Sequence, residues 1–284
     1  MNNLKVSIFM LAYNHEDYIE TAIESILMQK VNFNYRIYIG EDCSTDHTRE
    51  ICIKYKNSYP DKIELILHDF NIGPSRNAKI IYNSCSNSLS KYVAVLESDD
   101  YWSDIYKLQK QVDFLDNNDQ YIGCFHNTEE RIENSNQASF LYCNLPTGRN
   151  ITFQDLCKEN IVPTCSILFR NKYINQLPEN HFEILCGDWA LHLFNLQFGD
   201  YWYMPVVMGV HRYTNNSIWS GKSQKKNEEK ILDTYDNYIK TYSSDIEKLS
   251  YLKKSKKMFY LKSNYKLIRF YYQLINKFQK IFQS

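Results

Sequence analysis

Residues 6–29 read VSIFMLAYNHEDYIETAIESILMQ, and this stretch determines the class of the fold. Its first part, 6–12, is a continuous apolar run, which is the pattern of a buried strand. Its second part, 16–29, is amphipathic, with apolar side chains at helical spacing. These apolar positions are Ile19, Ala22, Ile23, Ile26 and Leu27. A buried strand that passes through a short polar loop into an amphipathic helix predicts an α/β fold.

The same alternation continues through the N-terminal half of the chain. Asp46 is a suitable N-cap for the next helix. Alternating strands and helices of this length predict a parallel sheet wrapped by helices, with right-handed crossovers. The order of the strands cannot be read from the pattern. Further strands are predicted at 35–39, 63–67 and 92–96, and further helices at 46–57, 76–85 and 105–117.

The second half of the chain is less regular. The pattern predicts strands at 121–126, 165–169 and 202–210, helices at 152–159 and 187–198, a polar loop at 127–150, and helix from 223 to the end. We therefore expect one α/β body followed by a helical C-terminal appendage from about residue 222.

The cysteines and the hydropathy pattern bear on the cellular compartment. Eight cysteines are dispersed along 284 residues, and none forms a CxxC pair. This dispersal argues against a zinc ribbon and predicts reduced thiols, many of them buried. No signal peptide precedes the first strand, and no apolar run approaches the ~18–20 residues that span a bilayer. We expect a cytoplasmic protein.

Charge is unevenly distributed, although the formal net charge is zero. Residues 251–284 contain nine Lys or Arg and no Asp or Glu, so the first 250 residues carry a net charge of −9. The basic segment also contains several Phe and Tyr, but the acidic body argues against nucleic-acid binding. Two alternatives remain for this segment. It lies as an interfacial helix on an anionic membrane surface, or it packs on the body or on a second subunit.

Polar side chains follow each of the first four predicted strands. The segments are 13–15, 40–46, 68–77 and 97–100, and most of their charged residues are acidic. Ligands of open parallel sheets bind outside the carboxyl ends of the strands, so these segments should meet at one ligand site. Loops are polar in any protein and acidic residues cap helices, so one such loop alone would carry little weight. The prediction depends on the convergence of all four.

The stretch 96–102, LESDDYW, places the carboxylates of Glu97, Asp99 and Asp100 within four positions. Neighbouring carboxylates repel one another unless a cation is close. Mg²⁺ and Mn²⁺ prefer oxygen ligands and usually combine one or two carboxylates with substrate phosphates. Arg76 is the main basic residue of the four loops, and neither GxxxxGK[ST] nor GxGxxG occurs, which argues against a bare phosphate cradle and a nicotinamide site. We therefore predict a divalent metal that carries a diphosphate.

Four segments resemble glycosyltransferase family 2, whose members have the GT-A nucleotide-sugar-binding fold. The segments are 6–29, GEDCSTDHT at 40–48, NIG at 71–73 followed by Arg76-Asn77, and LESDDYWSDIYKLQKQVDFL at 96–115. The resemblance covers roughly residues 4–220. It implies a Rossmann-like sheet with helices on both faces, in one domain at 1–221. Residues 1–100 would form its nucleotide-binding half and 101–221 its acceptor half, followed by a basic helical region at 222–284.

The resemblance assigns roles to residues of the first three loops. It implies that Asp42 hydrogen-bonds the nucleobase, usually uracil, and that Tyr13 flanks this base. It also implies that Asn71, in the NIG segment, contacts the nucleotide sugar. Arg76 would approach the base or the diphosphate.

The resemblance also assigns roles to residues 97–100, the acidic loop. Glu97-Ser98-Asp99 occupies the position of the family's DxD motif, with Glu97 in place of the first Asp. The family pattern implies that Glu97 and Asp99 contact the donor. It further implies that Asp99 binds the ribose or the metal and that Asp100 is the direct metal ligand. The implied cofactor is Mn²⁺ or Mg²⁺.

A general base is implied as well. The family carries an acidic residue at the start of a helix beyond the DxD position, and Asp188 in CGDWAL at 186–191 matches it. Such a carboxylate takes the proton of the acceptor hydroxyl. The alternative role for Asp188 is a helix N-cap, because apolar residues follow it at helical spacing. Trp189 either shapes the acceptor side or belongs to the core.

The family has a Tyr-Arg-x-His loop that precedes a Trp-Ser pair. The segment 210–221 matches this loop only in part. Alignment on Trp219 places Arg212 at the family's Arg, which lies on the donor, and Thr214 where relatives have His. His211 is then displaced by three residues. Either His211 serves as a metal or phosphate ligand, or that contact is missing.

Together these matches imply a metal-dependent inverting glycosyltransferase, either a hexosyl- or an N-acetylhexosaminyl-transferase. It would move a sugar from a nucleotide diphosphate sugar, with UDP the expected nucleotide, to a hydroxyl of a growing bacterial glycan. The glycan or lipid-linked acceptor would belong to surface polysaccharide or lipooligosaccharide assembly at the inner face of the cytoplasmic membrane.

Two alternatives to this function stay open. A sugar nucleotidyltransferase needs a Gly-rich, basic first loop, and Leu11-Ala12-Tyr13-Asn14 is neither. A catalytically inactive glycan-binding or scaffolding module would account for Glu97 and Thr214 as departures from the family pattern.

Overall fold

The computed structural model describes residues 4–264, apart from 134, 136, 144, 185 and 215–223. All the strands and helices predicted for the N-terminal half are present, with ends that differ by up to three residues. In chain order they are β1 (Leu4–Ala12), α1 (Ile19–Leu27), β2 (Asn34–Glu41), α2 (Thr48–Ser58), β3 (Ile63–Leu67), α3 (Pro74–Asn87) and β4 (Tyr92–Val95).

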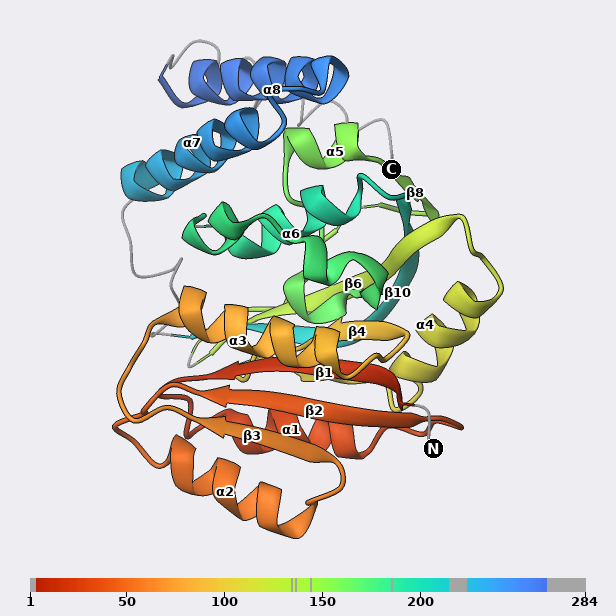
Figure 1. Cartoon of the computed structure of the whole chain (residues 1–284), viewed down its shortest axis with the longest axis vertical. Coiled ribbons are helices and arrows are strands. Elements are labelled where there is room, and N and C mark those ends of the chain that lie inside the picture. Colours follow the sequence, from red (N-terminus) through yellow and green to blue (C-terminus); the bar gives the residue numbers. More distant parts are fainter. Residues whose placement is uncertain are drawn as a thin grey trace.

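The second half adds further strands and the remaining helices (Figure 1). They are β5 (Tyr101–Trp102), α4 (Lys107–Asp116), β6 (Tyr121–Ile132), β7 (Phe140–Leu141), β8 (Arg149–Ile151), α5 (Phe153–Lys158), β9 (Leu168–Arg170), α6 (Gly187–Asn195), β10 (Asp200–Tyr213), α7 (Gln224–Thr241) and α8 (Ile246–Asn264). Short 3₁₀ helices lie at Thr164–Ser166, Asn171–Gln176 and Glu179–Glu183.

Two predictions for this half were wrong in part. Residues 127–132 continue β6 instead of forming a loop, because buried hydrogen bonds satisfy their polar side chains. Asn127 Nδ2 donates to the Cys143 carbonyl at 2.8 Å, and Thr128 Oγ1 donates to Glu130 Oε1 at 2.8 Å. The predicted strand at 165–169 begins instead as a 3₁₀ helix, and β9 starts only at Leu168.

The sheet is mixed. The parallel sheet predicted from the N-terminal half is present in β1 to β4, and the second half of the chain adds antiparallel strands. The strand order of the sheet is β3-β2-β1-β4-β9-β6-β10-β5. The strands β1 to β4 are parallel, and β6 is parallel to β10, but β9 lies antiparallel between β4 and β6. Hydrophobic patterns reveal burial and period but not the direction of the neighbouring strand.

Helices cover both faces of the sheet (Figure 1). Alternate side chains of β1 enter two different cores, Phe9 on one face and Ile8 and Met10 on the other. The helices α1, α2 and α4 pack on the face of Ile8, and α3, α5 and α6 pack on the face of Phe9. This two-sided burial is what a strand that is apolar at almost every position predicts.

Gly40 lets α3 lie directly against β2. A Cβ atom at Gly40 would stand 2.0 Å from Asn77 Oδ1. Instead, Asn77 Nδ2 donates a hydrogen bond of 2.8 Å to the Gly40 carbonyl. The close approach fixes the end of β2 against the start of α3, and with it the loop that carries Asp42.

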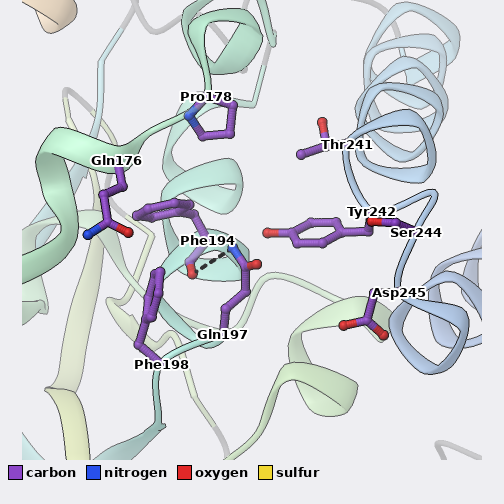
Figure 2. Close-up of a pocket in the computed structure, with 9 residues that line it drawn as sticks. All are labelled: Gln176, Pro178, Phe194, Gln197, Phe198, Thr241, Tyr242, Ser244 and Asp245. Carbon is purple, nitrogen blue, oxygen red and sulfur yellow. Dashed lines mark hydrogen bonds between the residues drawn. The ribbon is translucent and has the colours of Figure 1, made fainter.

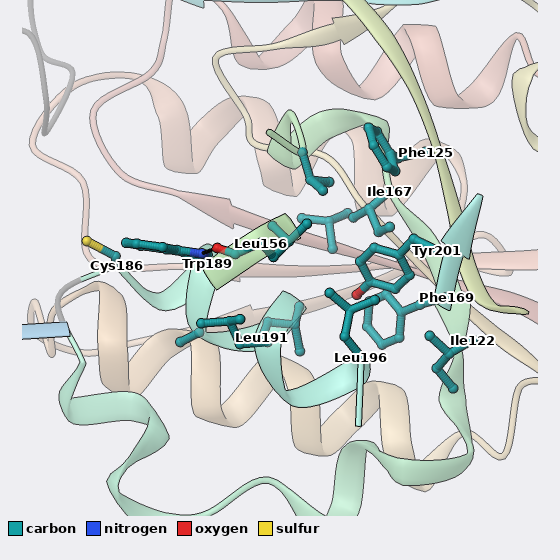
Figure 3. Packing of buried hydrophobic residues seen from close by; sticks show 14 of the residues in the cluster. Ile122, Phe125, Leu156, Ile167, Phe169, Cys186, Trp189, Leu191, Leu196 and Tyr201 are labelled. Carbon is teal, nitrogen blue, oxygen red and sulfur yellow. Dashed lines mark hydrogen bonds between the residues drawn. The ribbon is translucent and has the colours of Figure 1, made fainter. Parts of the chain in front are cut away.

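The C-terminal helices α7 and α8 pack on the body. Tyr235 of α7 donates through its hydroxyl to the Cys157 carbonyl at 2.7 Å, and its ring meets Trp189 edge to face at 5.2 Å. Figure 3 shows Trp189 beside Leu156 and Leu191 in this cluster. Leu252 of α8 is also buried in it, so packing on the body holds for this part of the basic segment. Residues 265–284 of that segment lie outside the described residues.

The thiols agree with the prediction from the cysteine spacing. All eight cysteines are free, and all but Cys43 are buried. Among the helices that the structure describes, none combines the length and the apolar character needed to cross a membrane.

Candidate active site

The acidic loop lies between the end of β4 and the start of β5, and β10 holds it in place. The Arg212 backbone amide donates to Asp100 Oδ1 at 2.9 Å, and the Arg212 guanidinium donates to the Asp99 carbonyl. The guanidinium carbon lies 4.9 Å from the centroid of the Tyr18 ring and 5.0 Å from that of Tyr101. Arg212 was predicted to contact the donor, and in the structure it contacts the loop that carries the carboxylates.

Burial and the neighbouring carboxylates oppose the ionisation of Glu97 and Asp100 in this loop. Burial, followed by the charges of Asp99, Asp100 and Asp188, raises the pKa of Glu97 to about 8. Burial also raises the pKa of Asp100 to about 7, although His211 opposes this shift. Carboxylates that disfavour their own ionisation gain from a divalent cation, and their oxygens suit Mg²⁺ or Mn²⁺. The donor set of Asp99 and Asp100 therefore fits the implied metal.

The protein does not form a complete metal cage by itself. Among the described residues, no three Asp, Glu, His or Cys side chains form a metal-binding group. Asp100 is only 1% exposed, with one oxygen held by Arg212, whereas Asp99 is partly exposed. Mg²⁺ commonly keeps waters or substrate phosphates as its remaining ligands, so two carboxylates would be enough.

His211 lies beside the acidic loop, but its ring is paired with Glu130. His211 Nδ1 lies 2.7 Å from Glu130 Oε2, and Glu130 is fully buried. Burial of the ring lowers its pKa, but Asp100, the hydrogen bond to Glu130 and Asp99 together outweigh burial and raise the pKa of His211 to about 9. In this state the ring is an imidazolium, which neutralises charge beside Asp100 and cannot ligate a metal until it loses a proton.

Asp42 organises the NIG loop. Its Oδ1 accepts the backbone amide of Ile72 at 2.8 Å, and its Oδ2 accepts that of Gly73 at 2.9 Å. Asn71 Oδ1 also accepts the Gly73 amide at 3.0 Å. The carboxylate predicted to recognise a nucleobase is thus also the anchor of the neighbouring loop. Arg76, in the first turn of α3, is exposed.

The loop after β1 connects the second loop to the acidic loop. Asn14, with a left-handed φ of 54°, accepts the Thr45 backbone amide at 2.8 Å. His15 Nδ1 lies 2.6 Å from Ser98 Oγ. Tyr13 stands next to them with 42% of its surface exposed, as an aromatic wall for a planar ligand requires. The predicted convergence of these loops is therefore present.

Asp188 lies in the first turn of α6, at the second residue of the helix, and the N-cap position belongs to Cys186. Its Oδ2 accepts Asn160 Nδ2 at 2.9 Å and Thr164 Oγ1 at 3.4 Å. Burial raises the pKa of Asp188, and hydrogen bonds from backbone amides at the helix start oppose this. Its charge is felt at Glu97, so the two carboxylates share one electrostatic environment.

The structure also places Trp189 and Thr214, and it decides between the two alternatives for Trp189. Trp189 is buried, and its Nε1 donates to the Leu156 carbonyl at 2.7 Å, which assigns it to the core. Thr214 is 3% exposed at the end of the described part of its loop, and Trp219 lies outside the described residues. Glu130, His15 and Ser98 were not singled out by sequence reasoning. Glu130 fell within the predicted loop, where no alternation marked it as buried.

A concavity of about 410 Å³ lies at the opposite end of α6, between that helix and the α7–α8 turn. Figure 2 shows Phe194, Phe198 and Tyr242 facing it. Its polar side chains are largely engaged within the protein. Both Asp245 oxygens accept from Lys248, at 3.0 and 2.8 Å, and Gln197 Nε2 donates to the Phe194 carbonyl at 3.1 Å. The pocket contains none of the predicted site residues, so it is separate from the candidate active site.

Comparison with known proteins agrees with this geometry. Residues 7–177 match the family model described as "Glycosyl transferase family 2", which is more than half of the chain. The putative teichuronic acid biosynthesis glycosyltransferase TuaG of Bacillus subtilis is 28% identical over 226 residues, which cover 78% of this chain and 85% of TuaG. The mycobacterial relatives that match at 32% identity are longer, and the chain spans 60% of their length.

Solved structures share the fold at low sequence identity. A crystal structure of S. aureus TarS in complex with UDP-GlcNAc superposes with a TM-score of 0.65 at 16% identity, over 92% of this chain and 74% of that one. The mannosyltransferase PcManGT from Pyrobaculum calidifontis, in complex with GDP-Man and Mn²⁺, gives a TM-score of 0.60 at 12% identity, over 92% and 76% of the two chains. These likenesses confirm the GT-A fold.

Replacing Asp42 by Asn should loosen the loop that follows β3. An amide group can accept only one of the two backbone amides that the carboxylate accepts, so we expect a loss of about 1–3 kcal/mol in unfolding free energy. Hydrogen exchange of the Ile72 and Gly73 amides should become faster. Asp69→Asn, at an exposed carboxylate of the same loop, is the control and should change neither quantity. Unchanged protection in Asp42→Asn would contradict the anchoring role.

The pair of His211 and Glu130 should make stability depend on pH. The pKa of His211 is raised to about 9 from an unfolded value of about 6.5, so its contribution is fully present below pH ~6.5 and is lost as pH rises through ~9. Glu130→Gln should therefore cost roughly 1–2 kcal/mol at pH 6, and less at pH 9.5.

The measurement is urea unfolding in EDTA at several pH values. Glu129→Gln removes an adjacent, partly exposed ion pair with Arg131 and is the control. Its difference from wild type should stay constant over this pH range. An equally constant difference for Glu130→Gln would show that the pair is not the source of the pH dependence.

Proposed function

Because this chain belongs to glycosyltransferase family 2, we propose that it transfers a sugar from a nucleotide diphosphate sugar to a hydroxyl of a bacterial glycan. The observation that supports the proposal is that contacts join the loops after β1, β2, β3 and β4, and that the charge of Asp188 acts on Glu97 in the last of them. UDP is the proposed nucleotide of the donor. It is the nucleotide that the family pattern implies, and TarS, which shares the fold, has been crystallised in complex with UDP-GlcNAc.

The proposed reaction is a single displacement with inversion at the anomeric carbon. The acceptor oxygen forms the new bond while the bond from the sugar to the diphosphate breaks. Asp99 and Asp100 would hold Mn²⁺ or Mg²⁺, which supplies Lewis-acid charge for the leaving diphosphate. Tyr13, Asn71, Arg76 and Glu97 remain proposed contacts of the donor, and the loops position it for in-line attack.

Asp188 is proposed to take the proton of the acceptor hydroxyl. Burial raises its pKa and so makes it a stronger base, while Asn160 and Thr164 fix one of its oxygens. The charge of Asp188 is close enough to Glu97 to raise the pKa of that carboxyl, so Asp188 lies near the proposed donor site, where the acceptor hydroxyl must attack.

The acceptor is proposed to be glycan or lipid-linked, in surface polysaccharide assembly at the cytoplasmic face of the membrane. TuaG, a relative that covers most of this chain, is named for teichuronic acid biosynthesis. The helix α8 exposes Lys253, Lys254 and Lys257, and positive charge of this kind is attracted to anionic lipid.

A panel of UDP, GDP and dTDP sugars, with and without Mn²⁺, tests the function. We expect one class of donor to raise the melting temperature and to be hydrolysed slowly, and EDTA should abolish both effects. Binding without hydrolysis or transfer would instead support a catalytically inactive module. If no donor changes the melting temperature, the proposal is wrong.

Asp188→Asn should reduce transfer by about 10²–10⁴-fold, because the amide cannot accept the proton. The dissociation constant of the donor should stay within about twofold of wild type, since Asp188 acts on the acceptor. Asp119→Asn, at a carboxylate whose side chain is 89% exposed, is the matched control and should leave both values unchanged. Near wild-type turnover of Asp188→Asn would remove the base assignment.

A further inference from the structure

A lysine occupies a fully buried position of α4. Lys107 is 0% exposed, and among the residues that the structure describes its Nζ has no hydrogen-bond partner. The next residue, Leu108, is also fully buried, as the core face of a helix requires. Burial lowers the pKa of Lys107 to about 7. A buried amine without a hydrogen-bond partner costs free energy, so packing alone does not explain Lys107.

The amine of Lys107 lies against the ring of Trp102. Its Nζ is 3.8 Å from the ring centroid, which is a cation–π distance. Trp102 is fixed at both ends: its Nε1 donates to the Cys165 carbonyl at 2.8 Å, and its backbone amide donates to Ser25 Oγ at 3.1 Å. In the sheet, Trp102 of β5 pairs with Gly209 of β10. Lys107 therefore completes the packing around β5.

A continuous set of contacts leads from this ring to the acidic loop. Trp102 follows Asp100 by two residues, and β10, which pairs with β5, also supplies the Arg212 amide to Asp100. Cys165, whose carbonyl holds the indole, also lies near Asp100, because burial and then the charge of Asp100 raise the pKa of its thiol. A shift of Trp102 would consequently move the acidic pair.

Two other buried polar atoms in this region support a specific role for the amine. Gln111, one turn along α4, uses its Nε2 for the Cys124 and Ser166 carbonyls at 3.0 and 2.9 Å, which leaves Oε1 as an acceptor. Burial and then the Lys107 charge lower the pKa of His126 to about 3. The neutral ring donates from Nδ1 to the Asn127 carbonyl at 2.7 Å, so Nε2 is an acceptor as well. Lys107 Nζ, Gln111 Oε1 and His126 Nε2 are thus three buried polar atoms for which the described residues supply no hydrogen-bond partner.

We propose that Lys107 is a positioning residue: it holds Trp102 and β5, and through them the Asp99–Asp100 pair, in the arrangement that binds the metal and the nucleotide. The inference rests on the proposed function. Lys107 does not touch the donor. An apolar side chain of equal length would fill the same space, but it would not fix the face of the indole.

The test separates this role from stability. Exchanging a buried, unpaired charge for an apolar group of similar volume is commonly neutral or stabilising, so Lys107→Met should fold and melt at or above the wild-type temperature. Its affinity for nucleotide with Mn²⁺ should nevertheless fall by about tenfold or more, because about 1.4 kcal/mol of misplacement is a factor of ten. UDP, GDP and dTDP are each titrated with Mn²⁺ by calorimetry, and the one that wild type binds most tightly is used for the variants.

Two further variants complete the experiment. Lys110→Met makes the same exchange at an exposed residue of α4 and should leave binding unchanged. Trp102→Phe should weaken binding too, and the double variant Lys107→Met/Trp102→Phe should lose less affinity than the sum of the single losses, since both act through one contact. Lys107→Gln provides a second neutral side chain with the same expected result.

Each outcome decides the matter. Weaker binding with an unchanged or higher melting temperature supports the inference. Wild-type affinity in Lys107→Met overturns it, and so does failure of both neutral variants to fold, which would assign Lys107 to stability. A wild-type protein that binds none of the three nucleotides overturns the proposed function and this inference together.

Discussion

The hydrogen bond from the Arg212 amide to Asp100 joins the two halves of the sheet at the candidate site. Asp100 follows β4, which belongs to the parallel strands β1 to β4, and Arg212 belongs to β10, on the other side of β9. The guanidinium of Arg212 strengthens the junction through the Asp99 carbonyl and two tyrosine rings. Together with the contact between His15 and Ser98, this junction holds the acidic loop against the repulsion of its carboxylates. The loop can stay in place before any cation binds because β10 holds it.

The N-terminal half of the fold was predictable because its strands and helices follow from the local pattern of apolar residues. A strand buried on both faces is apolar at almost every position, and a helix that packs on it is amphipathic. The strands and helices from β1 to α4 were therefore located to within a few residues. The antiparallel strand β9 was not predictable in direction, because its three residues carry no signal for which neighbour they meet. The end of β6 was missed for a different reason. Asn127, Thr128 and Glu130 are polar and buried. Hydrogen bonds offset the free-energy cost of their burial, and the partners lie far along the chain or on the same strand.

The candidate site was predictable in its membership more than in its contacts. Convergence of the four loops followed from the sheet rule, and contacts between these loops confirm it. The functional roles of Asp42, Asp99, Asp100 and Asp188 stay predictions of the family pattern. The hydrogen bonds and ion pairs that these residues make within the protein could not be predicted from the sequence. Asp42 accepts two backbone amides from a loop 30 residues away, and Glu130 pairs with a histidine 81 residues away. Pairs of this kind depend on tertiary distances, which periodicity does not contain.

These interactions explain how several carboxylates can lie close together in a folded protein. Each buried carboxylate has donors that limit its cost: backbone amides for Asp42, Arg212 for Asp100, and Asn160 and Thr164 for Asp188. Glu97 has the raised pKa of about 8, with burial as its first cause and the neighbouring charges next. A group in that position adopts the neutral form near pH 7 until positive charge arrives. Partial satisfaction of the other carboxylates therefore holds the geometry, while the residual repulsion at Glu97 leaves an electrostatic gain for a divalent cation.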